Sequence, residues 1–167
     1  AEDVSLSAID SFPSSVQADH TGLAFDGESY WEVSGGYSSG VRLAHLDADG
    51  ELIAPYQPGH DFRAVSAGPD GTVYTSDFTS ATVSTVSSSG TVTPFVTLAG
   101  PVDAQGTITI NETGDRFITQ QSGTVQLWNL DGTAAETVTL EGWSPSDMYG
   151  LDSVRVAQTA GMYGVPE

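Results

Sequence analysis

Glycine-containing turns recur along this chain at a nearly constant spacing. They fall into two sets of three, with 40 to 44 residues between successive members: Asp26-Gly27, Asp70-Gly71 and Thr113-Gly114, then Asp49-Gly50, Ser89-Gly90 and Asp131-Gly132. Short runs rich in β-branched and aromatic residues flank these turns, which is the sequence signal of a β-hairpin. The spacing therefore predicts an all-β chain built from units of about 42 residues.

Apolar residues keep the same spacing when the units are aligned on the second set of glycines. The aligned positions are Leu43, Val83 and Val125, followed by Leu46, Val86 and Trp128. Each unit then reads as four strands in two hairpins. A sheet this small cannot bury both of its faces alone, so we expect neighbouring units to stack on these apolar positions.

Periods of 40 to 45 residues with four strands are typical of β-propeller blades. The segments 22–27, 69–77 and 123–132 resemble blades of the NHL, YVTN and SMP-30-like propellers. The resemblance implies one β-propeller-like domain or segment of four-stranded antiparallel blades. Its expected parts are an N-terminal strand within 1–19, blades at 20–61, 62–103 and 104–146, and a partial blade at 147–167.

The two ends leave the number of blades open, because a propeller needs at least about four blades to close. The chain could be a fragment of a larger propeller. Alternatively, a strand from Val4 to Phe12, placed like the fourth strand of a preceding blade, could complete a four-bladed ring. In a third alternative, copies of the chain assemble edge to edge, because unpaired strand edges favour association.

An aspartate precedes each unit at a spacing of 42 to 44 residues: Asp19, Asp61, Asp103 and Asp147. In propellers of the resembled kind this position lies near the central channel, where a ring of carboxylates could bind Ca²⁺. The simpler alternative is that each aspartate accepts backbone hydrogen bonds that close a turn.

His20 and His60 lie beside Asp19 and Asp61. The SMP-30-like resemblance implies a second possibility for these residues, a metal-dependent hydrolase or lyase with its site at the channel mouth. No complete ligand or catalytic set of that kind is visible, so we assign no catalytic residue and list the two histidines as binding candidates. Tyr37 and Trp143 are expected in loops and are candidates for contact with a sugar or a protein.

Charge excludes several classes of partner. The chain has 22 acidic residues and 4 arginines without any lysine, which gives a formal net charge of -18. Such a chain has no basic face for nucleic acid. It has no cysteine, and no apolar run long enough for a membrane helix. We expect neither nucleic-acid binding nor membrane insertion.

The first residues, Ala1-Glu2-Asp3, are what cleavage of a signal peptide at a small residue leaves behind, although a chain cut from a longer protein would begin in the same way. We therefore expect an extracellular or cell-surface location. The function that we expect is non-catalytic, in binding or in extracellular self-assembly. The expected partner is another copy of the chain, another extracellular protein or a glycan, and Ca²⁺ is the only cofactor considered.

Overall fold

Three four-stranded sheets make up the part of the protein that the computed structural model describes, which is residues 11–14, 20–35, 42–78, 80–100, 102, 108–121 and 124–139. The first sheet comprises β1 (His20–Phe25), β2 (Tyr30–Ser34), β3 (Leu43–Leu46) and β4 (Leu52–Tyr56). The second comprises β5 (Phe62–Ala67), β6 (Val73–Asp77), β7 (Thr82–Val86) and β8 (Val92–Thr97). The third comprises β9 (Ile108–Ile110), β10 (Arg116–Gln121), β11 (Thr124–Asn129) and β12 (Ala134–Thr139).

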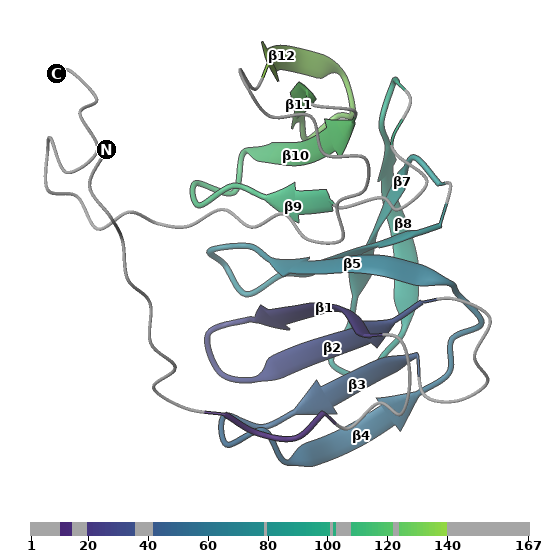
Figure 1. Cartoon of the computed structure of the whole chain (residues 1–167), viewed down its shortest axis with the longest axis vertical. Helices are drawn as coiled ribbons and strands as arrows, with labels where there is room; N and C mark the ends of the chain where they lie inside the picture. The colour runs from purple at the N-terminus through teal and green to yellow at the C-terminus, as the bar shows by residue number, and fades with distance from the viewer. Residues whose placement is uncertain are drawn as a thin grey trace, which may run out of the picture.

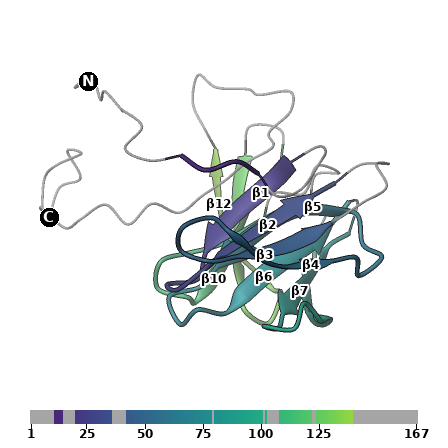
Figure 2. The ribbon, with the colours of Figure 1, turned by 90° about the horizontal axis from the view of Figure 1, so that it is seen from below.

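Each sheet is antiparallel, and its strands follow one another in sequence order. The first strands of the three sheets, β1, β5 and β9, contact one another in turn, and the other strands spread outwards from them (Figures 1 and 2). The predicted all-β chain of four-stranded antiparallel units is confirmed for the described residues. In that part of the chain, no helix has the length and apolarity that crossing a membrane requires.

The six glycines singled out in the sequence all adopt positive φ, between 73° and 105°. Only glycine takes this backbone conformation without steric cost. In the second set, the amide of each glycine donates to the carbonyl three residues earlier, namely that of Asp47, Ser87 or Asn129. The predicted turns are therefore confirmed, and the three hairpins of this set close by the same hydrogen bond.

Strand register shows which residues are equivalent in the three sheets. Tyr30, Val73 and Phe117 pair with Leu46, Val86 and Trp128, which are the positions that the sequence aligned. Two hydrophobic cores fill the spaces between sheets. One joins Trp31 and Leu43 of the first sheet to residues of the second, and the other joins Tyr74 and Val83 of the second to residues of the third.

The first sheet has one face that no other described sheet covers. We call it the open face and define it by Leu23, Phe25, Tyr30, Glu32 and Leu46. The counterparts of Leu23 in the other sheets, as read from the register, are Val65 and Ile108. Those two are 8% and 4% exposed because the preceding sheet packs on them, whereas Leu23 is 53% exposed.

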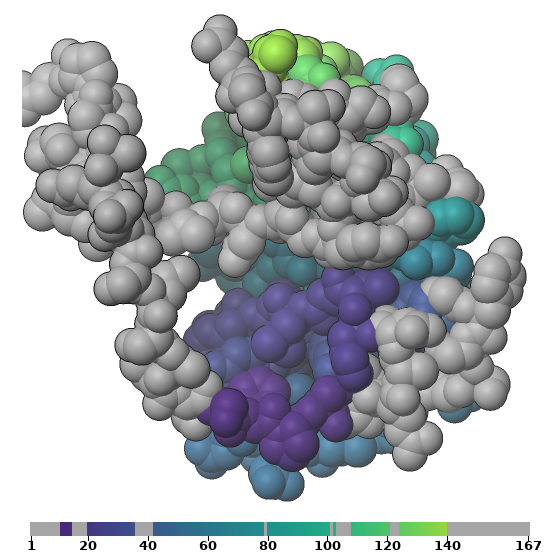
Figure 3. All heavy atoms as spheres, in the orientation of Figure 1, coloured from purple at the N-terminus to yellow at the C-terminus, as the bar shows by residue number. Residues whose placement is uncertain are grey.

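Phe12 covers part of the open face at the outer strands. It packs against the cluster of Ala44 and Leu46, and its ring lies against Gly50. Tyr56, 44 residues later at the end of β4, lies against Gly90 in the same way. Figure 3 shows residues 11–14 in purple on the surface of the first sheet. Phe12 thus makes the contact expected at the end of a preceding blade; residues 1–10 of the predicted strand lie outside the described residues.

Asp26 organises the hairpin between β1 and β2. Burial pushes the pKa of its carboxyl up, but hydrogen bonds outweigh this and lower the pKa below its ordinary value of 3.8. The donors are the backbone amides of Glu28 and Ser29, the Ser29 hydroxyl and Trp31 Nε1. The ionised carboxylate therefore stabilises the fold.

We expect Asp26→Ala to lower the free energy of unfolding by about 2 kcal/mol at neutral pH, as is usual for lost hydrogen bonds to a charged group. Because the folded-state pKa is lowered, the contribution of Asp26 is present above the ordinary carboxyl pKa and is lost as pH falls through the folded value. Urea unfolding at pH 7 and at successively lower pH should show the two proteins converging. A difference that is constant with pH would contradict this assignment.

Candidate functional site

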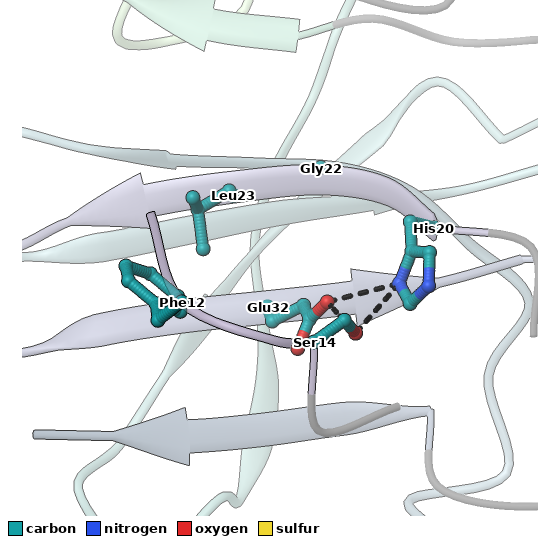
Figure 4. A pocket seen from close by; sticks show the side chains of 6 residues that line it. All are labelled: Phe12, Ser14, His20, Gly22, Leu23 and Glu32. Atoms are coloured by element: carbon teal, nitrogen blue, oxygen red, sulfur yellow. Dashed lines mark hydrogen bonds and ion pairs between the residues drawn. The ribbon is translucent and has the colours of Figure 1, made fainter. Parts of the chain in front are cut away.

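An open groove of about 490 Å³ lies on the open face, at the end where β1 begins. Its lining comes from β1, β2 and the segment 11–14: Phe12, Ser14, His20, Gly22, Leu23 and Glu32 (Figure 4). The groove lies between the first strand of the sheet and the segment that covers its outer strands.

Strand register explains why the Glu32 side chain lies in the groove. Leu23 of β1 pairs directly with Glu32 of β2, so both side chains project from the same face. His20 begins β1, where a bulge shifts the register before Gly22. Phe62 has the corresponding position in the second sheet, with the same shift, and is fully buried.

Three polar side chains meet in the groove. His20 Nδ1 lies 2.9 Å from Glu32 Oε1 and 3.1 Å from Ser14 Oγ, and the Ser14 hydroxyl also donates to Glu32 Oε1. The Glu32 side chain is only 8% exposed, whereas that of His20 is 48% exposed. The groove therefore holds a nearly buried carboxylate at its base and an accessible imidazole at its rim.

These contacts do not form a nucleophilic triad. In a Ser-His-acid triad the hydroxyl and the acid occupy opposite nitrogens of the imidazole. Here both Ser14 and Glu32 contact Nδ1. The arrangement suits recognition of a ligand, in which a fixed carboxylate and apolar walls define the shape and charge that bind.

His60, the other predicted histidine, has a separate acid partner. Its Nδ1 lies 2.6 Å from Asp77 Oδ2, and its ring stacks on Phe62 with 5.4 Å between centroids. Asp61, predicted to act with His60, instead contacts Arg63 at 3.2 Å. The sequence analysis missed Glu32 and Asp77, which lie 12 and 17 residues from their histidines. Strand pairing brings the acids close to the histidines, because Glu32 pairs with Leu23 of β1 and Asp77 pairs with Phe62 at the start of β5.

The remaining predicted site residues, Asp19, Asp103, Asp147, Tyr37 and Trp143, lie outside the described residues. Among the residues that are described, no three or more His, Asp or Glu side chains gather as a metal site. The calcium ring needs the three aspartates that are not described, so it stays a prediction. The metal-dependent enzyme also involves Asp19, which is not described, so it stays a prediction as well.

Comparison with known proteins adds evidence on the fold. No protein-family model and no curated protein sequence matches the chain. Among solved structures, virginiamycin B lyase from Staphylococcus aureus superposes with a TM-score of 0.50 at 16% identity, covering 74% of this chain and 42% of that one. A protein of unknown function from Bacteroides caccae gives 0.50 at 16% identity, covering 78% and 48%. U3-55K gives 0.54 at 15% identity, covering 77% and 41%.

Virginiamycin B lyase has a propeller-type fold, so this likeness supports a propeller-like relationship for the three sheets. The chain spans less than half the length of each of the three similar chains. At these identities the likeness concerns the fold alone. It does not distinguish the NHL, YVTN and SMP-30-like families that the sequence resembles.

Proposed function

We propose that this chain is a non-catalytic, exported or surface protein that self-assembles, with a second copy packing on the open face to extend a propeller-type ring. One observation carries the proposal. Phe25 is 49% exposed, whereas Ile110, its counterpart in the third sheet, is 2% exposed beneath the second sheet. The open face thus carries apolar residues at positions that a neighbouring sheet covers elsewhere in the same molecule.

The size of the similar chains supports further sheets as the occupant of the open face, and a second copy would supply them. The three sheets match between 41% and 48% of those chains. A ring of that kind would therefore hold roughly twice as many sheets as the three described here, within the usual propeller range of about four to eight. Two copies of this chain supply that number.

Net charge opposes the association, because each copy carries -18. Salt screens repulsion between charged surfaces and also strengthens burial of apolar surface when the salt is strongly hydrated. We therefore expect the assembly to form more readily at high salt.

Light scattering on the full chain tests this. We expect a mass of at least twice 17.3 kDa in about 1 M sodium sulfate. Phe25→Asp should return the mass to that of one chain, because it places a charge in the apolar contact. Thr93→Asp is the matched control, since it adds the same charge at an exposed position of β8 in the second sheet.

A single-chain mass for the unaltered protein at every salt concentration would refute self-assembly. Equal disruption by Thr93→Asp would show that the added charge, and not the open face, controls the mass. Far-UV circular dichroism of both variants establishes that each remains folded.

A further inference from the structure

We propose that the groove binds an organic cation, a guanidinium or alkylammonium group carried on an apolar stem, with the cation at Glu32 and the stem along Phe12 and Leu23. This inference goes beyond self-assembly and does not require it, because a small cation can bind to one chain.

The repeat itself shows that Glu32 is an exception. Register places it at the position of Thr75 and Thr119, which are 2% and 3% exposed beneath the preceding sheets. The hydroxyls of both threonines are satisfied within their own sheets: Thr75 donates to the carbonyl of Ala64 at 2.7 Å, and Thr119 accepts from Trp128 Nε1 at 2.9 Å. The open face has a carboxylate where the covered faces have a neutral, internally bonded group.

His20 is a second exception on the same face. Phe62, at the corresponding position, is fully buried between the first and second sheets. Two polar side chains in contact therefore replace two side chains that close a packed interface. Where β1 begins, the open face therefore has polar side chains that can bind a ligand. Phe25, at the other end of β1, keeps the apolar character of an interface.

The carboxylate determines the charge of the ligand. Glu32 is nearly buried, and its contacts with Ser14 and His20 hold it beside the groove (Figure 4). An apolar ligand would remove the remaining water from this carboxylate without replacing its hydrogen bonds, which is costly. An anion would be repelled both by Glu32 and by a chain of net charge -18, which instead attracts cations.

The walls of the groove determine the kind of cation. A hard metal ion such as Ca²⁺ takes six to eight oxygen ligands, and the groove offers one carboxylate and one hydroxyl from its lining side chains. Phe12 and the half-exposed Leu23 instead provide apolar surface on one side of Glu32, away from His20 (Figure 4). An aromatic ring also attracts a cation at its face. An organic cation with a short hydrocarbon stem satisfies both parts of the groove.

The test is to titrate the full chain with N-acetyl-arginine amide and to monitor the titration by NMR. The matched probe is N-acetyl-citrulline amide, which has nearly the same shape without the charge. We expect the arginine probe to shift the signals of His20 and Leu23 with a dissociation constant in the millimolar range, as for a small ligand with few contacts. The citrulline probe should bind at least about tenfold more weakly.

Variants assign the binding to the groove. Glu32→Gln, which keeps the shape of the side chain, should weaken the arginine probe at least about tenfold. Glu28→Gln is the matched control, because it removes the same charge from the exposed hairpin of the same sheet and should leave affinity unchanged. Leu23→Ala should weaken binding about threefold by removing apolar contact, and tests the groove independently should Glu32→Gln fail to fold.

Equal binding of the citrulline probe would overturn the inference. The inference would also be overturned if Glu28→Gln weakened binding of the arginine probe as much as Glu32→Gln does. That result would mean that the net charge of the chain, and not the groove, determines the affinity. Hexylammonium distinguishes the source of the cation: binding as tight as the arginine probe indicates a free amine, and absent binding indicates an arginine side chain. Failure here leaves the mass of the Phe25→Asp variant unaffected, so the two proposals are tested separately.

Discussion

Replacing Gly132 by alanine is expected to lower the free energy of unfolding by about 3 kcal/mol, the sum of a strained backbone and an obstructed contact. Gly132 has a φ of 84°, and a β-carbon there would lie 2.4 Å from the carbonyl oxygen of Thr97. The Gly132 carbonyl also accepts the amide of Ala99 at 2.8 Å. The substitution therefore forces the third sheet away from the second.

Gly59→Ala isolates the contribution of the contact. Gly59 has almost the same φ, 82°, but an added β-carbon there would have no neighbour within 4 Å. We expect this variant to lose only the backbone cost, about 1 kcal/mol. Urea unfolding followed by circular dichroism measures both variants. Equal losses would mean that close approach between the sheets contributes nothing at Gly132.

Phe117→Ala is expected to cost about 4 kcal/mol, because it leaves a cavity in the core between the second and third sheets. Phe117 is fully buried, and its ring meets Tyr74 edge-on with 5.2 Å between centroids. Phe95 contacts the same two rings but is 47% exposed, so Phe95→Ala should cost about 1 kcal/mol. Urea unfolding compares the two variants. Similar losses in the free energy of unfolding would mean that Phe117 contributes no more to this core than the half-exposed Phe95.

Much of the fold could be predicted from the sequence because the repeat depends on local signals. A turn glycine such as Gly90 is required by the backbone of its own hairpin, and alignment on these glycines placed Val83 and Val86 at the buried positions. These signals lie within a few residues of one another. They describe a hairpin well, but they do not say which of its faces another sheet will cover.

The candidate site depended on longer-range information. His20 was identified, but its partner Glu32 looked like an ordinary residue of a strand, and Ser14 belongs to a segment before the first unit. The aspartate predicted to act with His60 is its sequence neighbour Asp61, which instead contacts Arg63. His60 lies two residues before β5, and it meets Asp77 because Asp77 pairs with Phe62, the first residue of β5.

The contact between each turn glycine and the end of the preceding sheet has a direction along the chain. Tyr56 packs against Gly90, and Thr97 lies against Gly132. Each such contact therefore joins a turn to residues that come earlier in the sequence. A ribosome delivers the N-terminal residues first, and domains generally fold in that order during synthesis. Each sheet can therefore dock as soon as it emerges, on a surface that is already in place, and the growing chain need not wait for its C-terminal residues before burying its apolar side chains.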